Sequence, residues 1–202
     1  DLDSRRISAR EEILKGIFTG DKERSMKIYV ARHGQTEWNA LNKVCGRTDL
    51  PLTQEGIEQA KKLSAAVSRL HIDLIVASPM ERALQTARAV AEENGIPYIV
   101  DDRLIEQDYG IYEGVDRLDE GFLANKRQFA YRYPKGESMM QVAHRTYGLL
   151  DGLRKTHANE NILLVCHGGV ARVIRTYFID MTNDEFSSYN TENCSCIEYT
   201  LP

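Results

Sequence analysis

Three short segments of the chain carry side chains that can bind and transfer a phosphoryl group. They are Arg32-His33-Gly34, Ser78 with Arg82, and His167-Gly168-Gly169. Guanidinium groups bind phosphate oxygens through paired hydrogen bonds, and glycines leave neighbouring backbone N–H groups open to an anion. A histidine can act as a covalent nucleophile when one ring nitrogen is neutral and a hydrogen bond holds the other. This combination of residue types predicts a site for phosphate chemistry.

The three segments each follow a predicted strand, at residues 27–31, 73–77 and 161–166. In open α/β sheets, ligands collect outside the carboxyl ends of the strands, where loops and helix N-termini converge. All three segments can therefore line one pocket. Taken singly, each has an ordinary explanation as a solvated charge, a rim residue or a tight turn, and it is their coincidence at equivalent strand ends that favours a site.

Strand and helix patterns alternate from residue 26 onward, which predicts an α/β domain with a mainly parallel sheet. Further strands are expected at 98–100 and near 195–201, and helices at 53–69, 78–94, 138–156 and 170–178. In the first helix, Ile57, Ala60, Leu63 and Val67 should share a buried face. Ser78 and Ser138 are the expected N-cap residues of the second and third helices, with Glu81 and Gln141 completing their capping boxes.

Composition limits the class of protein. The chain has 202 residues and a formal net charge of −4, which fits one globular domain and argues against a nucleic-acid or membrane surface. No apolar run is long enough to span a bilayer and the N-terminal residues do not resemble a signal peptide, so a cytoplasmic protein is expected. The four cysteines are irregularly spaced and are expected to be reduced thiols.

Residues 1–25 are predicted to form an N-terminal extension, separate from a catalytic domain at 26–202. Ser8 and Glu11 could cap a short helix there. A docked helix, a partner-binding helix and an expression remnant remain open.

Five motifs resemble the histidine phosphatase superfamily, also called the phosphoglycerate mutase-like family. They are RHGQTEWN at 32–39, GRTDLPLT at 46–53, SPMERA at 78–83, the stretch from Glu106 to Gly114, and VCHGG at 165–169. The resemblance covers about residues 26–200 in the expected order, and the opening motif is specific. It implies a three-layer α/β fold with helices on both faces of the sheet.

The resemblance also implies a role for each matching residue. His33 becomes the phosphorylated nucleophile, with Arg32, Arg82 and His167 around the phosphate. Asn39 contributes an amide, and Glu106 is the proton donor. Apart from the resemblance, Gly168 is expected to bind substrate through the backbone N–H groups that its glycine pair leaves open, and Asp108, two residues from Glu106, is the second choice for the acid. No metal or cofactor is expected. In-line transfer leaves an alkoxide that needs a proton, so a carboxylic acid beside the pocket fits the chemistry independently.

Phosphatases and mutases of this family share these residues. The span between Glu106 and His167 is modest, and the motif YRYPKGES at 131–138 resembles fructose-2,6-bisphosphatase and broad-specificity phosphatases. A phosphatase acting on a small phosphorylated metabolite is therefore expected first, a phosphoglycerate mutase second and a catalytically idle binding protein third. By the same resemblance, Arg132, Lys135 and Arg172 are expected to form a second anion site. The substrate and the oligomeric state stay open.

Overall fold

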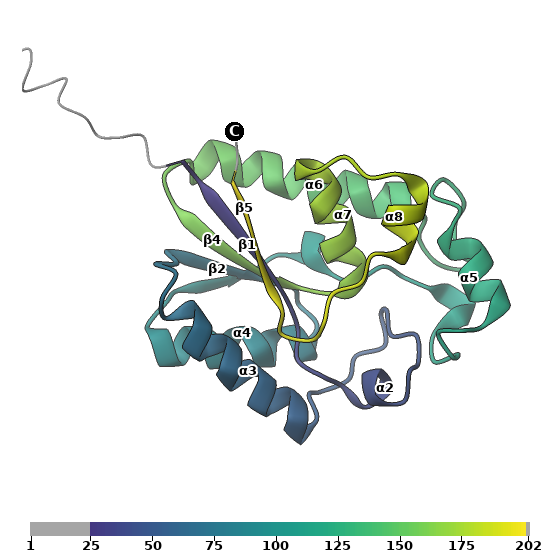
Figure 1. Cartoon of the computed structure of the whole chain (residues 1–202), viewed down its shortest axis with the longest axis horizontal. Helices are drawn as coiled ribbons and strands as arrows, with labels where there is room; N and C mark the ends of the chain where they lie inside the picture. The colour runs from purple at the N-terminus through teal and green to yellow at the C-terminus, as the bar shows by residue number, and fades with distance from the viewer. Residues whose placement is uncertain (1–24, 201–202) are drawn as a thin grey trace, which may run out of the picture.

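The computed structural model describes residues 25–200, which form a central five-stranded sheet (Figure 1). The strands are β1 (Lys27–Arg32), β2 (Leu74–Ala77), β3 (Tyr98–Val100), β4 (Asn161–Cys166) and β5 (Cys196–Thr200). Their order is β3-β2-β4-β1-β5, with β5 antiparallel to β1 and the other pairs parallel. The predicted mainly parallel sheet and the positions of its strands are confirmed. No helix in the described part of the chain is long and apolar enough to cross a bilayer.

Helices cover both faces of the sheet, so the three-layer fold is also confirmed (Figure 1). The α-helices are α2 (Glu37–Ala40), α3 (Gln54–Val67), α4 (Glu81–Asn94), α5 (Glu120–Lys126), α6 (Met139–Thr156), α7 (Gly168–Phe178) and α8 (Asn183–Ser188). Two short 3-10 helices, η1 (Asp102–Leu104) and η2 (Gly110–Tyr112), lie between β3 and α5. The helix suggested near Ser8 lies outside the described residues.

Alternating side chains of the strands fill two separate cores, because successive residues of a strand point to opposite faces of the sheet. In β1, Ile28 and Val30 join the core beneath α6 and α7, whereas Tyr29 and Ala31 join the core beneath α3 and α4. All six residues of β4 are buried, as expected for a central strand covered on both sides. The carboxyl ends of β1 and β4 are therefore held on a rigid base.

The buried face of α3 differs from the prediction at one position. Ala60, Leu63 and Val67 are buried, but Ile57 is 39% exposed and Gly56 takes the inward position. A Cβ on Gly56 would lie 2.2 Å from the carbonyl oxygen of Gln35, so only glycine permits this close approach. The contact fixes the rotation of the helix and turns Ile57 toward solvent.

The predicted cap of α4 is wrong, whereas that of α6 is confirmed. Ser138 and Gln141 form the expected capping box of α6. The N-cap of α4 is Met80, which makes no side-chain capping bond. Ser78 lies two residues earlier and its hydroxyl is 2.7 Å from Nε2 of His167. The hydroxyl therefore contacts an imidazole of the candidate site.

Candidate active site

His33 directly follows β1 and is held in one tautomer. Its Nδ1 is 2.6 Å from the carbonyl oxygen of Gly34, which can only accept, so Nδ1 carries the proton. Its Nε2 accepts a hydrogen bond from Nε of Arg82 at 3.3 Å. Burial, together with the guanidinium groups of Arg82 and Arg32, lowers the pKa of His33 well below its ordinary value of 6.5. His33 is therefore a neutral imidazole with a lone pair on Nε2.

The loop at residues 46–48 fixes Arg82, which is fully buried. The guanidinium of Arg82 donates to the carbonyl oxygens of Gly46 at 2.7 Å and Thr48 at 3.0 Å. The carboxylate of Glu113 holds that loop from the other side, because it accepts the backbone N–H groups of Gly46, Arg47 and Thr48. A contact chain thus runs from Glu113 through the loop and Arg82 to the nitrogen of His33.

His167 directly follows β4, at the N-cap of α7, and lies beside His33, with ring centroids 5.1 Å apart. Nε2 of His167 contacts the hydroxyl of Ser78, whereas its buried Nδ1 has no hydrogen-bond partner among the described residues. Burial and the neighbouring Arg82 lower the pKa of His167 well below its usual value, so this ring is also neutral. An unpaired buried nitrogen is costly unless a ligand completes it.

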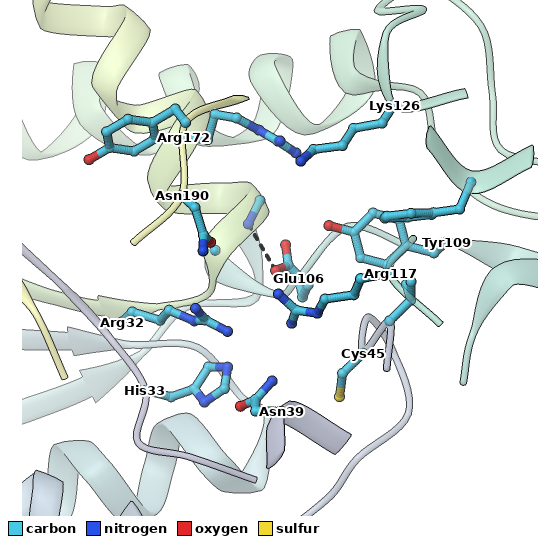
Figure 2. Close-up of a pocket in the computed structure, with 15 residues that line it drawn as sticks. Arg32, His33, Asn39, Cys45, Glu106, Tyr109, Arg117, Lys126, Arg172 and Asn190 are labelled. Atoms are coloured by element: carbon cyan, nitrogen blue, oxygen red, sulfur yellow. Dashed lines mark hydrogen bonds between the residues drawn. The ribbon is translucent and has the colours of Figure 1, made fainter. Parts of the chain in front are cut away.

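Arg32 and Asn39 complete the same wall of the pocket (Figure 2). Arg32 donates to the carbonyl oxygen of Thr191, while its buried Nε has no partner among the described residues. Burial lowers the pKa of Arg32 to about 10, and nearby Arg117 contributes to this shift. The Oδ1 of Asn39 accepts the backbone N–H of Thr36, so the amide nitrogen is the end of the side chain left for a ligand.

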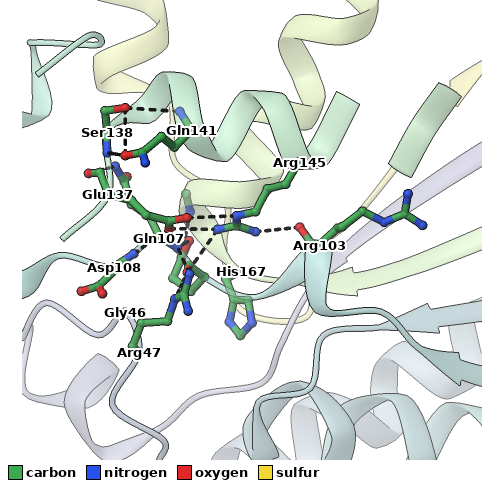
Figure 3. Close-up of polar contacts among 12 residues, drawn as sticks. Gly46, Arg47, Arg103, Gln107, Asp108, Glu137, Ser138, Gln141, Arg145 and His167 are labelled. Carbon is green, nitrogen blue, oxygen red and sulfur yellow. Dashed lines mark hydrogen bonds and ion pairs between the residues drawn. The ribbon is translucent and has the colours of Figure 1, made fainter. Parts of the chain in front are cut away.

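Glu106 faces the pocket, whereas Asp108 does not. The carboxylate of Glu106 is buried and accepts the backbone N–H groups of Gln107 at 2.7 Å and Gly169 at 3.0 Å. Arg47 and Arg145 both donate to its backbone carbonyl oxygen (Figure 3). The side chain of Asp108 instead accepts the backbone N–H of Gly110 and stabilises a turn. Of these two carboxylates, Glu106 alone lines the pocket.

Residues 109–136 form a segment, here called the excursion, whose two ends are held together by the residues that flank it. Asp108 and Glu137 are joined twice, by Glu137 N–H to the carbonyl oxygen of Asp108 at 2.9 Å and by Asp108 N–H to the Glu137 carboxylate at 3.1 Å. Arg145 and Arg47 form ion pairs with the same carboxylate (Figure 3). A Cβ on Gly136 would lie 2.3 Å from the carbonyl oxygen of Asp108, so the two ends are in backbone contact.

The pocket has a volume of about 90 Å³ and opens to solvent, and its lining residues can be described as an inner and an outer half. The inner half comprises Arg32, His33, Asn39, Glu106 and Gly168, with Arg82 and His167 directly behind His33. Three further cations line the pocket, namely Arg117, whose side chain extends toward Arg32 and Glu106, and Lys126 and Arg172, whose ends meet in the outer half (Figure 2). Of these, Arg172 alone was expected, and it is buried with its guanidinium 5.1 Å above the ring of Phe186.

Of the predicted cluster of Arg132, Lys135 and Arg172, only Arg172 lines the pocket in this structure. Arg132 and Lys135 are exposed and do not line the pocket. The buried residue of that turn is Tyr133, which stacks against Phe122 at a ring separation of 5.8 Å. Since Tyr133 occupies the inward position, its charged neighbours stay at the surface. Arg117 and Lys126 come from the excursion, where no sequence motif marks them.

No group of three or more histidine, cysteine, aspartate or glutamate side chains suited to a metal ion lies within residues 25–200. The four cysteines are free thiols, and Cys166 is buried in β4 as expected. The polar groups that converge in the pocket are guanidinium, imidazole, amide and carboxyl groups. Together these groups are suited to bind an anion, to form a covalent bond with it and to transfer a proton.

Comparison with known proteins places this arrangement in context. A model of the histidine phosphatase superfamily (branch 1) matches residues 28–201. Phosphoserine phosphatase 1 of Hydrogenobacter thermophilus is 31% identical over 177 residues, covering 84% of each chain. The probable phosphoglycerate mutase GpmB of Enterobacter sp. (strain 638) is 38% identical over 151 residues, covering 71% of this chain and 70% of that protein.

Solved structures give the same result. Mycobacterial glucosyl-3-phosphoglycerate phosphatase superposes with a TM-score of 0.77 at 25% identity, covering 87% of this chain and 90% of that chain. The alpha-ribazole phosphatase of Shigella flexneri superposes with a TM-score of 0.74 at 27% identity, covering 86% and 89%. Both phosphatases and a mutase by name therefore occur among the relatives.

Proposed function

The chain belongs to the histidine phosphatase superfamily, and on that premise we propose that it hydrolyses small phosphate monoesters through a phosphohistidine on His33. The observation that carries the proposal is the state of His33. Its Nδ1 proton is donated to Gly34 and its Nε2 lone pair lies beside Arg82. The nucleophile needs no deprotonation before it attacks phosphorus.

In the first step, Nε2 of His33 forms a bond to phosphorus as the bond from phosphorus to the ester oxygen breaks. Without substrate, Nε2 accepts a hydrogen bond from an Arg82 N–H. When Nε2 attacks, this N–H donates to a phosphate oxygen instead. The unpaired Nε of Arg32 and Nδ1 of His167 supply further polar contacts to the same group. Charge on the transferring phosphoryl group is thereby neutralised by groups already in position.

Glu106 donates the proton that the leaving alkoxide needs. In the second step, water attacks the phosphohistidine while Glu106 takes its proton, and inorganic phosphate leaves. Guanidinium and imidazole groups perform the charge neutralisation in this scheme, so we expect turnover to persist in the presence of a chelator.

A mutase is the second candidate, because a protein named probable phosphoglycerate mutase is among the relatives. A mutase must exclude water from its phosphohistidine and hold a bisphosphate intermediate. The excursion is short, at residues 109–136, and offers a small cover over the pocket, which favours hydrolysis. Release of free phosphate rather than an isomerised product distinguishes the two reactions.

Trapping the intermediate tests the proposal. Phosphoramidates survive base and break down in acid, so rapid quenching in base during turnover of p-nitrophenyl phosphate should yield phosphate on the peptide containing His33. His33→Ala should abolish this adduct and turnover, whereas His144→Ala removes an exposed histidine of α6 and should retain both. A stable adduct on serine or cysteine would contradict the mechanism.

A further inference from the structure

The segment at residues 191–195 lies between α8 and β5 and passes beside the inner half of the pocket. It makes three hydrogen bonds with Arg32. The Arg32 guanidinium donates to the carbonyl oxygen of Thr191, and the backbone N–H of Arg32 donates to that of Ser195 at 3.3 Å. In return, the backbone N–H of Cys194 donates to the carbonyl oxygen of Arg32 at 2.9 Å. The carboxyl end of β1 is therefore held by a segment that is distant in sequence.

Asn193 extends these contacts to the nucleophile. Its amide nitrogen donates to the carbonyl oxygen of His33 at 2.9 Å. The backbone N–H of His33 donates to the carbonyl oxygen of Cys166 in β4, also at 2.9 Å. Both backbone groups of His33 are thus paired, one with the central strand and one with Asn193. Because the imidazole is attached to this backbone, the pairing limits how far Nε2 can move from the line of attack.

The same amide nitrogen orients Asn39. Nδ2 of Asn193 lies 3.3 Å from Oδ1 of Asn39, and this oxygen also accepts the backbone N–H of Thr36 at 3.1 Å. One end of an asparagine amide accepts and the other donates, so hydrogen bonds decide which end faces the pocket. Two donors on Oδ1 leave the amide nitrogen of Asn39 toward the pocket (Figure 2). An anion bound there meets a donor and not an acceptor.

The turn that carries Asn193 has an unfavourable backbone conformation. Cys194 has a φ of 56°, in the left-handed region that residues with a Cβ rarely adopt. The backbone N–H and the hydroxyl of Ser195 both donate to the carbonyl oxygen of Glu192, at 3.2 and 2.8 Å. Such conformations persist where surrounding contacts fix them, and they are frequent at functional sites. The turn is therefore held in the shape that brings Asn193 to His33 and Asn39.

We propose that Asn193 is a positioning residue for phosphoryl transfer, which holds the backbone of His33 and presents the amide nitrogen of Asn39 to the phosphate. Asn193 itself is not among the described residues that line the pocket, so it acts through these two partners. The inference rests on the proposed function, because it assumes that the transferred phosphoryl group is bound beside His33 and Asn39. Asn193 lies outside the five motifs that indicated the site.

Asn193→Asp tests the proposal with a change that keeps the shape of the side chain. A carboxylate has no N–H and would face the oxygens of His33 and Asn39, so the Asn39 amide should rotate and turn its oxygen toward the phosphate. We expect kcat/KM for p-nitrophenyl phosphate to fall about 10–100-fold, the usual effect of one charge-assisted hydrogen bond. Asn183→Asp makes the same change at an exposed position of α8 and should retain wild-type kinetics.

A second mutation shows whether Asn193 acts through Asn39. Asn39→Ala removes the amide that Asn193 orients, so adding Asn193→Asp to this variant should lower kcat/KM by less than about 3-fold. Asn193 is partly exposed, so a carboxylate without Asn39 beside it can turn to solvent. Circular dichroism reports whether each variant is folded. If Asn193→Asp does not fold, Asn193→Ala takes its place, because it loses both hydrogen bonds without adding a charge.

Binding of inorganic phosphate separates this inference from the proposed function. Calorimetric titration of phosphate requires no turnover, and Asn193→Asp should weaken binding about 10-fold. Weaker phosphate binding in a protein that hydrolyses no ester would retain the role of Asn193 and overturn the phosphatase. Hydrolysis by Asn193→Asp with wild-type kinetics would overturn the inference and leave the phosphatase intact. Equal losses from Asn193→Asp with and without Asn39 would also overturn the inference, because Asn193 would then act on the fold alone.

Discussion

The inner and outer halves of the pocket differ in how firmly hydrogen bonds hold their positive charges. In the inner half, Arg82 donates to two backbone carbonyl oxygens and Arg32 donates to another. In the outer half, Arg172 leaves a buried donor unpaired and Lys126 has a lowered pKa. Backbone carbonyl oxygens thus hold the inner arginines in place, although Nε of Arg32 is also without a partner among the described residues. The ion pairs within residues 25–200, by contrast, include neither Lys126 nor Arg172.

Glu106→Gln should have the largest effect among changes outside the nucleophile. The amide keeps the shape but cannot donate the proton, so kcat for alkyl phosphates should fall by about 10²–10⁴-fold. Aryl phosphates with good leaving groups should lose less in single-turnover assays of the transfer step. Equal losses on alkyl and aryl phosphates would contradict a role of Glu106 as proton donor. They would indicate that Glu106 supports the structure of the inner half instead.

Glu113→Gln tests whether the inner half depends on its supporting loop. One amide oxygen cannot accept all three backbone N–H groups of residues 46–48, so Arg82 should lose its fixed position. We expect kcat for p-nitrophenyl phosphate to fall about 10-fold, equivalent to about 1.4 kcal/mol, while KM changes little. Glu120→Gln, at an exposed position of α5, is the control. A loss that merely follows the melting temperature would identify a purely structural role.

The pH dependence of stability should sharpen the contrast further. His33 and His167 are kept neutral in the fold, whereas both take up protons in the unfolded chain below about pH 6.5. The unfolded state then binds more protons, so the free energy of unfolding should decrease as the pH falls below that value. Each histidine contributes up to about 1.4 kcal/mol per pH unit. Urea unfolding of His33→Asn between pH 7.5 and 5.5 should show a shallower decline than wild type.

Removal of residues 1–25 should have the smallest effect. Every described residue that lines the pocket lies between Arg32 and Asn190, and the family match begins at residue 28. A protein starting at Met26 should therefore retain its turnover number. Steady-state kinetics with p-nitrophenyl phosphate measure this. A large loss in a folded truncation would show that the extension completes one of the two halves.

The two halves also differ in how far the sequence reveals them. His33, Arg82 and His167 follow strands or begin helices, so contiguous motifs and the shared edge of parallel strands suffice to predict that they meet. Arg117 and Lys126 lie in an excursion whose path depends on Tyr133 and Phe122 packing inward. Local capping rules place Ser78 at a helix N-cap, because they cannot anticipate a partner 89 residues away in sequence. Side chains fixed by tertiary packing of irregular segments escape pattern analysis.

The two ends of the excursion are held together, so the segment can be treated as an exchangeable unit, here called a cassette. Because Asp108 and Glu137 tie its ends together, changes in its length carry a small entropic penalty, about 0.6 kcal/mol for a doubling of a flexible loop. Lys126 and Arg117 travel with the cassette, whereas His33 and Arg82 stay on the sheet and α4. Exchanging residues 109–136 for the corresponding segment of a relative should shift the preferred substrate while phosphohistidine formation from p-nitrophenyl phosphate continues. The fold thereby allows substrate repertoire to diverge without rebuilding the reaction centre.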